Sequence, residues 1–161
     1  MKFSTRQDIR VPIGFAYEQA ADFEAHARQA MRRGYSVERR DPDRPVDVGA
    51  CWEVVFPYRG KPRRVIGELV RLEPPNGYLV RSLSAGVRGH FEVELLALAR
   101  ARTRLRVALE LKPETLAARL MIQSARLARS RLDGMFSQRV EKFALETEER
   151  FRAGAQPSMR G

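Results

Sequence analysis

The feature that most constrains the fold of this chain is a long stretch without proline at its C-terminal end. After Pro113, residues 114–151 contain no proline and one glycine, Gly134. The apolar residues that recur there at three- and four-residue steps are Met121, Ala125, Ala128, Leu132, Met135, Phe136, Val140 and Phe143. Such a stripe predicts a long amphipathic helix. About thirty helical residues would span roughly 45 Å, more than the width of a small sheet, so we expect the helix to overhang the sheet or to bend at Gly134.

Upstream of this stretch, the hydrophobic pattern has a period of two, which predicts strands. The predicted strands cover residues 3–11, 35–40, 50–58, 63–73, 78–84, 87–98 and 102–112. Two short helices are predicted between the first two strands, over residues 13–23 and 24–33, and Gly34 is a natural helix stop. Because the later strands follow one another at hairpin spacing, we predict an α+β fold. In it, a curved antiparallel sheet of about six to seven strands wraps around the long C-terminal helix.

The length and composition of the chain fit one domain. Its 161 residues, of which 43% are apolar, can form one core. We assign residues 1–152 to a single domain and residues 153–161 to a flexible polar tail. The apolar runs are too short to span a bilayer, and the first residues lack the apolar stretch of a signal peptide, so we expect a cytoplasmic protein. Cys51 is the only cysteine, which excludes an intrachain disulfide and a cysteine metal cluster.

The net charge of +10 has two interpretations. A strongly basic protein can bind an acidic partner such as nucleic acid, the ribosome or anionic lipid. However, the arginines are spread along the whole chain and interleaved with acids, and 26 Arg against 4 Lys fit a compositional bias. No DNA-specific motif accompanies the charge. We therefore favour the compositional interpretation and keep a basic interaction module as an alternative.

The order of the elements resembles that of the START-like helix-grip superfamily, including its polyketide cyclase/dehydrase and lipid-transport branch. Three stretches carry the resemblance. Residues 9–17 run from a strand through Pro12 into a helix, residues 65–75 form a strand that ends in a proline turn, and residues 124–143 take the position of the gripped helix. None of them is a catalytic signature. The resemblance implies a cavity between the sheet and the long helix for a lipid-like, polyketide-like or other apolar or amphipathic molecule, and in some members a cyclase or hydrolase activity.

Two charged residues fall on strands that would border such a cavity. A four-residue turn over residues 74–77 would place Glu68, Val70 and Arg81 on the more apolar face of the sheet, which we take as the inner face. Glu68 is then the best candidate for a catalytic acid or base, with Arg81 or Tyr58 as an orienting group. The alternatives are a structural ion pair at the cavity rim and a wrong assignment of the face, because a one-residue slip would send both charges to solvent.

Further side chains are predicted to line the cavity. They are Trp52, Val54, Phe56, Tyr58, Phe91, Leu109, Met121, Ala125, Ala128 and Leu132. Aromatic side chains could pack a flat ligand, and the small Ala125 and Ala128 could leave room for one, although ordinary core packing would use the same residues. The two histidines, His26 and His90, lack metal-ligand spacing, and the chain has no phosphate-binding loop or nucleophile elbow. We therefore predict no metal and no cofactor.

The leading hypothesis is a small-molecule binding protein with an internal cavity between the sheet and the C-terminal helix. A cyclase or dehydrase that acts on a polyketide-like substrate is the first alternative, because Glu68 could supply its acid or base. The basic interaction module for an acidic partner is the second.

Overall fold

Strands and helices follow one another along the chain in the predicted order, except that the predicted C-terminal helix is divided into two. The computed structural model describes residues 1–155. Its elements are β1 (Lys2–Ile9), α1 (Ile13–Ala20), α2 (Phe23–Arg32), β2 (Ser36–Arg39), β3 (Cys51–Tyr58), β4 (Lys61–Glu73), β5 (Gly77–Ser84), β6 (Val87–Ala99), β7 (Arg102–Pro113), α3 (Leu116–Arg126) and α4 (Arg129–Ala155). Of the expected tail, residues 153–155 continue α4, and residues 156–161 lie outside the described residues.

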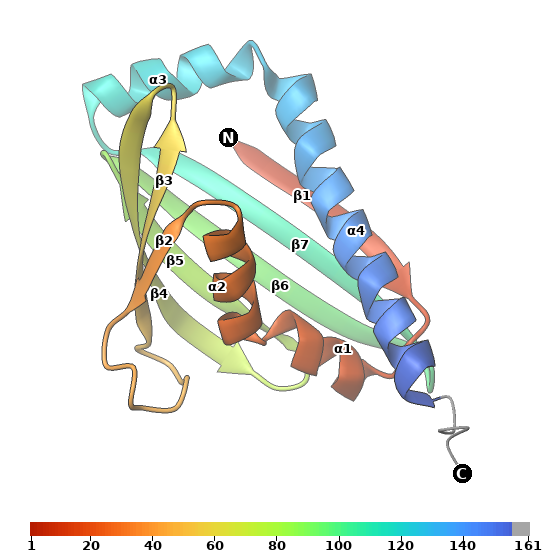
Figure 1. Ribbon diagram of the computed structural model, residues 1–161. Coiled ribbons are helices and arrows are strands. Elements are labelled where there is room, and N and C mark those ends of the chain that lie inside the picture. The colour runs from red at the N-terminus through yellow and green to blue at the C-terminus, as the bar shows by residue number, and fades with distance from the viewer. Residues whose placement is uncertain (156–161) are drawn as a thin grey trace.

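The seven strands form one antiparallel sheet in the order β1-β7-β6-β5-β4-β3-β2. Neighbouring strands from β2 to β7 are also neighbours in sequence, and only β1 crosses to pair with the last strand, β7. The sheet is curved, and α1, α2 and α4 lie on its concave side (Figure 1). This arrangement confirms the predicted helix-grip fold, including the two short helices after the first strand.

The C-terminal helix is broken at a different place from the one predicted. The break lies at Leu127 and Ala128, between α3 and α4, whereas Gly134 lies inside α4. At the break, the amides of Leu127 and Ala128 bond three residues back, to Ser124 and Ala125, which tightens the last turn of α3. The turn allows α3 to bury Ala118 and Ile122 while α4 runs in a new direction along β1. The bend therefore follows from how α3 and α4 pack against different parts of the sheet, and it does not lie at Gly134.

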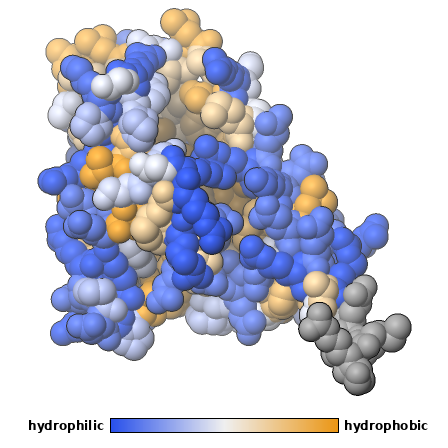
Figure 2. Space-filling view, in the orientation of Figure 1, coloured by the Kyte–Doolittle hydropathy of each residue, from blue (hydrophilic) through white to orange (hydrophobic). Residues whose placement is uncertain are grey.

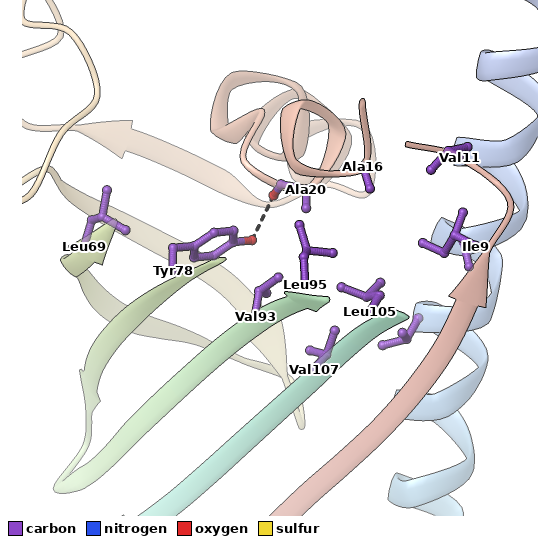
Figure 3. Close-up of a cluster of buried hydrophobic side chains, with 12 residues drawn as sticks. Ile9, Val11, Ala16, Ala20, Leu69, Tyr78, Val93, Leu95, Leu105 and Val107 are labelled. Carbon is purple, nitrogen blue, oxygen red and sulfur yellow. Dashed lines mark hydrogen bonds between the residues drawn. The ribbon is translucent and has the colours of Figure 1, made fainter. Parts of the chain in front are cut away.

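The core of the domain fills the space between the sheet, α1 and α4 (Figure 3). Ile9 and Val11, at the end of β1 and just beyond it, are fully buried there, as is Leu105 on β7. Thr103 is also fully buried, and its hydroxyl donates a 2.8 Å hydrogen bond to the carbonyl of Val11. This bond fixes the point where the chain leaves the sheet for α1, which in turn positions α2 over the sheet.

The pairing of β4 with β5 differs from the prediction and reverses one face assignment. Glu73 pairs with Gly77, so the turn is one residue shorter than expected, and the register shifts between Leu69 and Arg71. Such a bulge changes the alternation along the strand. Leu69 and Leu72 consequently both pack toward the core although they are three residues apart. The prediction that Glu68 and Arg81 face inward is wrong: the alternation on β4 is broken at the bulge, where the half-buried Val70 lies, and the shorter turn pairs Leu72 with Tyr78 instead of Leu79, which reverses the faces of β5.

Candidate ligand cavity

A cavity of about 860 Å³ lies between the concave face of the sheet, α2 and α4. Figure 2 shows recessed apolar surface between these two helices, below α3 in this view. The sheet contributes Trp52, Val54, Val65, Gly67, Tyr78, Val80, Ser82, Phe91, Val93, Leu105, Val107 and Leu109. The helical side contributes Ala20, Phe23, His26, Ala27, Gln29, Ala30, Phe136, Val140 and Phe143. The volume is within the range of small-molecule sites, and the lining is largely aliphatic and aromatic, as such sites require.

Aromatic rings form a continuous group on one side of the cavity. The ring of Phe23 on α2 lies 5.3 Å from that of Trp52 and 4.9 Å from that of Tyr78, and it is inclined at 66° to the tyrosine ring. Tyr78 in turn lies 6.5 Å from Phe91. These are ordinary distances for aromatic pairs. The rings join α2 to three strands, and they offer flat apolar surface to a molecule inside the cavity.

The few polar groups of the interior largely bond to the protein itself. The hydroxyl of Tyr78 donates to the carbonyl oxygen of Ala20 at 2.9 Å, as the dashed line in Figure 3 shows. Nε2 of His26 also lies 2.9 Å from this carbonyl, and must donate to it because a carbonyl only accepts. Burial raises the pKa of Tyr78 well above its ordinary range. Tyr78 is therefore a neutral structural donor, and it is no general base at ordinary pH.

Charged side chains gather where the helices border the cavity rather than in its interior. Arg32 is the last residue of α2 and Arg33 follows it, and Arg139, Lys142 and Glu146 belong to α4. Lys142 and Glu146 lie one helical turn apart, with nitrogen and oxygen 3.9 Å from each other. Most of these groups are cationic. The cavity thus combines an apolar interior with a polar and mainly positive rim, which suits a molecule with an apolar body and one polar or anionic end.

Of the residues expected to line a cavity, Trp52, Val54, Phe91 and Leu109 border this one. Phe56 is further along β3, where its ring lies 5.9 Å from that of Tyr35. Tyr58 is at the exposed end of β3, under the guanidinium of Arg59. This face of β3 therefore borders the cavity only at Trp52 and Val54, because the strand extends beyond the cavity.

The four predicted residues around the helix break do not line the cavity. Met121 is exposed and Ala125 half-buried on α3, Ala128 lies at the break, and Leu132 is half-buried in the first turn of α4. The cavity uses the next two turns of α4 instead, through Phe136, Val140 and Phe143. The apolar stripe of the sequence runs through both helices without interruption. It therefore could not indicate at which residue of α4 the cavity wall begins.

Glu68 and Arg81 lie on the outer face of the sheet, directly opposite one another on β4 and β5. Their side chains are about half exposed, at 46% and 50%, and their charged atoms are 3.5 Å apart. They border a separate open groove of about 1010 Å³ beneath the loop between β2 and β3, together with Arg39, Arg44 and Cys51. Glu68 is therefore not positioned to act as an acid or base inside the cavity, and the cyclase hypothesis loses the residue on which it depended.

Sequence reasoning missed the α2 side of the cavity, from Phe23 to Ala30. The short helix has an apolar side, but the pattern alone does not show which element that side faces.

Within residues 1–154, no group of three or more His, Cys, Asp or Glu side chains is placed to hold a metal ion. No helix among the described residues is long and apolar enough to cross a membrane.

Known proteins match this chain in three-dimensional structure but not in sequence. The sequence matches no model of a protein family. A search of curated proteins likewise gave no relative. Solved structures, in contrast, match over almost the whole chain.

The ZhuI aromatase/cyclase from Streptomyces sp. R1128 superposes with a TM-score of 0.69 at 16% identity, over 98% of this chain and 99% of that one. The protein TTHA0849 from Thermus thermophilus gives 0.63 at 18% identity, over 97% and 100%. A point mutant of norcoclaurine synthase from Thalictrum flavum gives 0.62 at 10% identity, over 91% and 94%. At such identities only architecture is shared. The structural matches, like the sheet and its helices, establish that this chain has the helix-grip fold of the START-like proteins.

Proposed function

We propose that the protein binds a small apolar or amphipathic molecule in the cavity between the sheet, α2 and α4. The observation that carries the proposal is a largely apolar space of about 860 Å³ in which Tyr78 and His26 already bond to a backbone carbonyl of the protein. Water in such a space finds few partners, so an apolar ligand gains from replacing it. The aromatic group around Phe23 and Trp52 favours a ligand with a flat or ring-containing body.

The positive rim supports a more specific ligand class. Arg32, Arg33, Arg139 and Lys142 outnumber the single carboxylate of Glu146 there. A ligand with a carboxylate or phosphate at one end could leave that end at the rim while its apolar part enters the interior. The fold supports the same proposal, because a solved structure with this architecture is an aromatase/cyclase. We therefore infer a lipid-like or polyketide-like acid as the ligand class.

Extraction of the natively purified protein, followed by mass spectrometry, tests this proposal. A variant that fills the cavity from both sides, Gly67→Phe with Ala27→Phe, is the comparison. A Cβ atom added at Gly67 meets only Val80 Cγ1, at 3.4 Å, so the rest of the new side chain can enter the cavity. We expect one class of apolar acid from the wild type and none from the filled variant. Recovery of the same compounds from both proteins, with both folded by circular dichroism, would refute the proposal.

A further inference from the structure

The helix α3 carries a second apolar face that no other element within residues 1–155 covers. At 100° per residue, Leu116, Leu120 and Leu127 lie within about 40° of one another around the helix axis. Ala118 and Ile122 lie on the opposite side, and these are the residues that α3 buries. The three leucines, which we call the leucine face, are 73%, 58% and 93% exposed. Single exposed leucines are common on proteins, but an aligned set opposite a packed face marks an interaction surface.

The charge around the leucine face is uniform in sign. Residues 115–132 contain four arginines, at positions 119, 126, 129 and 131, and no Asp or Glu. All four arginines are exposed. The nearest acids along the chain are Glu114, which is paired with Arg88 at 2.6 Å, and Asp133, which lies 3.6 Å from Arg129. On the outer face of the sheet, in contrast, arginines are paired with acids, and Arg106 contacts both Glu92 and Glu94. The segment around α3 is therefore a local concentration of positive charge rather than part of an even distribution.

We propose that α3 docks on the surface of an anionic lipid bilayer. An apolar stripe flanked by arginines is the pattern of helices that lie in the plane of a membrane interface, where the apolar side chains enter the acyl boundary and the cations contact the head groups. Arg119 and Arg126 lie on one flank of the leucine face and can reach head groups while the leucines insert. The neighbouring exposed Met121 would add apolar contact on the other flank.

A second copy of the chain is a poorer occupant of this face. In a two-fold dimer, the same surface meets itself, so Arg119 and Arg126 of one copy would lie against those of the other. No acid between residues 115 and 132 could relieve that repulsion. The helix also has only 11 residues, about 16 Å in length, which is short for a stable dimer interface. An anionic bilayer satisfies both the apolar face and the charge.

Membrane docking would bring the ligand cavity close to the bilayer. Figure 1 shows α3 across the end of the strands, and Figure 2 shows the recess between α2 and α4 below it. An apolar ligand could then pass between cavity and membrane with a short path through water. The docking proposal itself rests only on α3, so a protein that binds a cavity ligand but no vesicles would refute docking and leave the proposed function intact.

Co-sedimentation of the full chain with phosphatidylcholine vesicles, with and without phosphatidylglycerol, tests the proposal. We expect binding to the anionic vesicles that weakens with salt. The triple substitution Leu116→Ser, Leu120→Ser and Leu127→Ser should reduce it on the order of tenfold or more. The change Arg119→Gln with Arg126→Gln should reduce it by roughly 25-fold, about fivefold for each charge.

Two matched controls separate docking from general effects. Leu145→Ser removes a leucine that is 53% exposed on α4, and Arg6→Gln with Arg10→Gln removes the same charge from exposed positions in β1 and just after it. The affinity of both control variants for anionic vesicles should stay within about twofold of that of the wild type. Circular dichroism verifies that every variant is folded.

Either of two results would overturn the proposal. One is a wild type that fails to sediment with anionic vesicles, and the other is a leucine variant that binds as well as Leu145→Ser does. A concentration-dependent dimer that the leucine variant abolishes, without vesicle binding, would instead assign the leucine face to a second copy of the chain.

Discussion

The carbonyl oxygen of Ala20 provides a quantitative test of the cavity wall, because two side chains donate to the same atom. The hydroxyl of Tyr78 and Nε2 of His26 each lie 2.9 Å from it. Ala20 is the last residue of α1, so its carbonyl has no helical N–H as a partner. Either donor alone keeps the carbonyl paired. Only the loss of both leaves it buried without a partner.

This sharing predicts that the two substitutions are not additive. Tyr78→Phe and His26→Phe each remove one hydrogen bond from a carbonyl that remains paired, which should cost about 0.5–1.5 kcal/mol. The double substitution also leaves the carbonyl unpaired, which costs about 1–3 kcal/mol more. The free energy of unfolding of the double variant should therefore fall by more than the sum of the two single losses. Urea unfolding followed by circular dichroism measures all four proteins of the cycle.

Tyr35→Phe is the matched control, because Tyr35 contacts Phe56 in a different part of the sheet. Its combination with His26→Phe should be additive to within about 0.5 kcal/mol. If Tyr78→Phe and His26→Phe were additive to the same extent, the two side chains would not share an acceptor. The account of how α2 is held against the sheet would then be wrong.

Three other substitutions test separate parts of the structure. Glu68→Gln should change ligand affinity less than twofold and the free energy of unfolding by less than about 0.5 kcal/mol, because the half-exposed ion pair with Arg81 lies outside the cavity. A large loss of ligand binding would instead show that Glu68 belongs to the binding site. Thr103→Val should cost about 1–3 kcal/mol in urea unfolding, since it removes the buried bond to the carbonyl of Val11, and a neutral result would contradict that role. A hydrogen bond from Arg104 lowers the pKa of Asp8 in the folded state. The stability that this pair contributes is therefore present at neutral pH and is lost as the pH falls below about 4 and through the folded pKa. Asp8→Asn should accordingly destabilise the protein at pH 7 but flatten the decline in acid, whereas parallel pH profiles for the two proteins would contradict this.

The fold could be predicted from the sequence because each element carries its own periodic signal. The alternation in residues 102–112 and the stripe in residues 114–151 each need only local information, and their order along the chain selects the helix-grip arrangement. Proline and glycine then place the boundaries, as Gly34 does at the end of α2. Errors of one to three residues at element ends did not affect the architecture.

The candidate site could be predicted only in part, because it depends on single-residue irregularities. One bulge between Leu69 and Arg71 reverses the face of the preceding part of β4, and with it the position of Glu68. The helix break at Leu127 and Ala128 follows from tertiary packing and moves the cavity wall along α4. Neither feature has a distinct composition. The expected inward positions of Trp52 and Phe91 depend on no such irregularity, because both residues lie on regular parts of their strands.

Trp52 offers the most direct measurement of the central claim, that the cavity accepts an apolar ligand. It is the only tryptophan in the chain and it lines the cavity, so its fluorescence reports on this space alone. Titration with N-phenyl-1-naphthylamine, an uncharged flat probe, should quench Trp52 saturably in the wild type and in Gly67→Ala. In the filled variant, Gly67→Phe with Ala27→Phe, we predict an affinity lower by on the order of tenfold or more, because the probe loses its apolar contacts. Equal affinity in all three proteins would contradict the claim and place the probe outside the cavity.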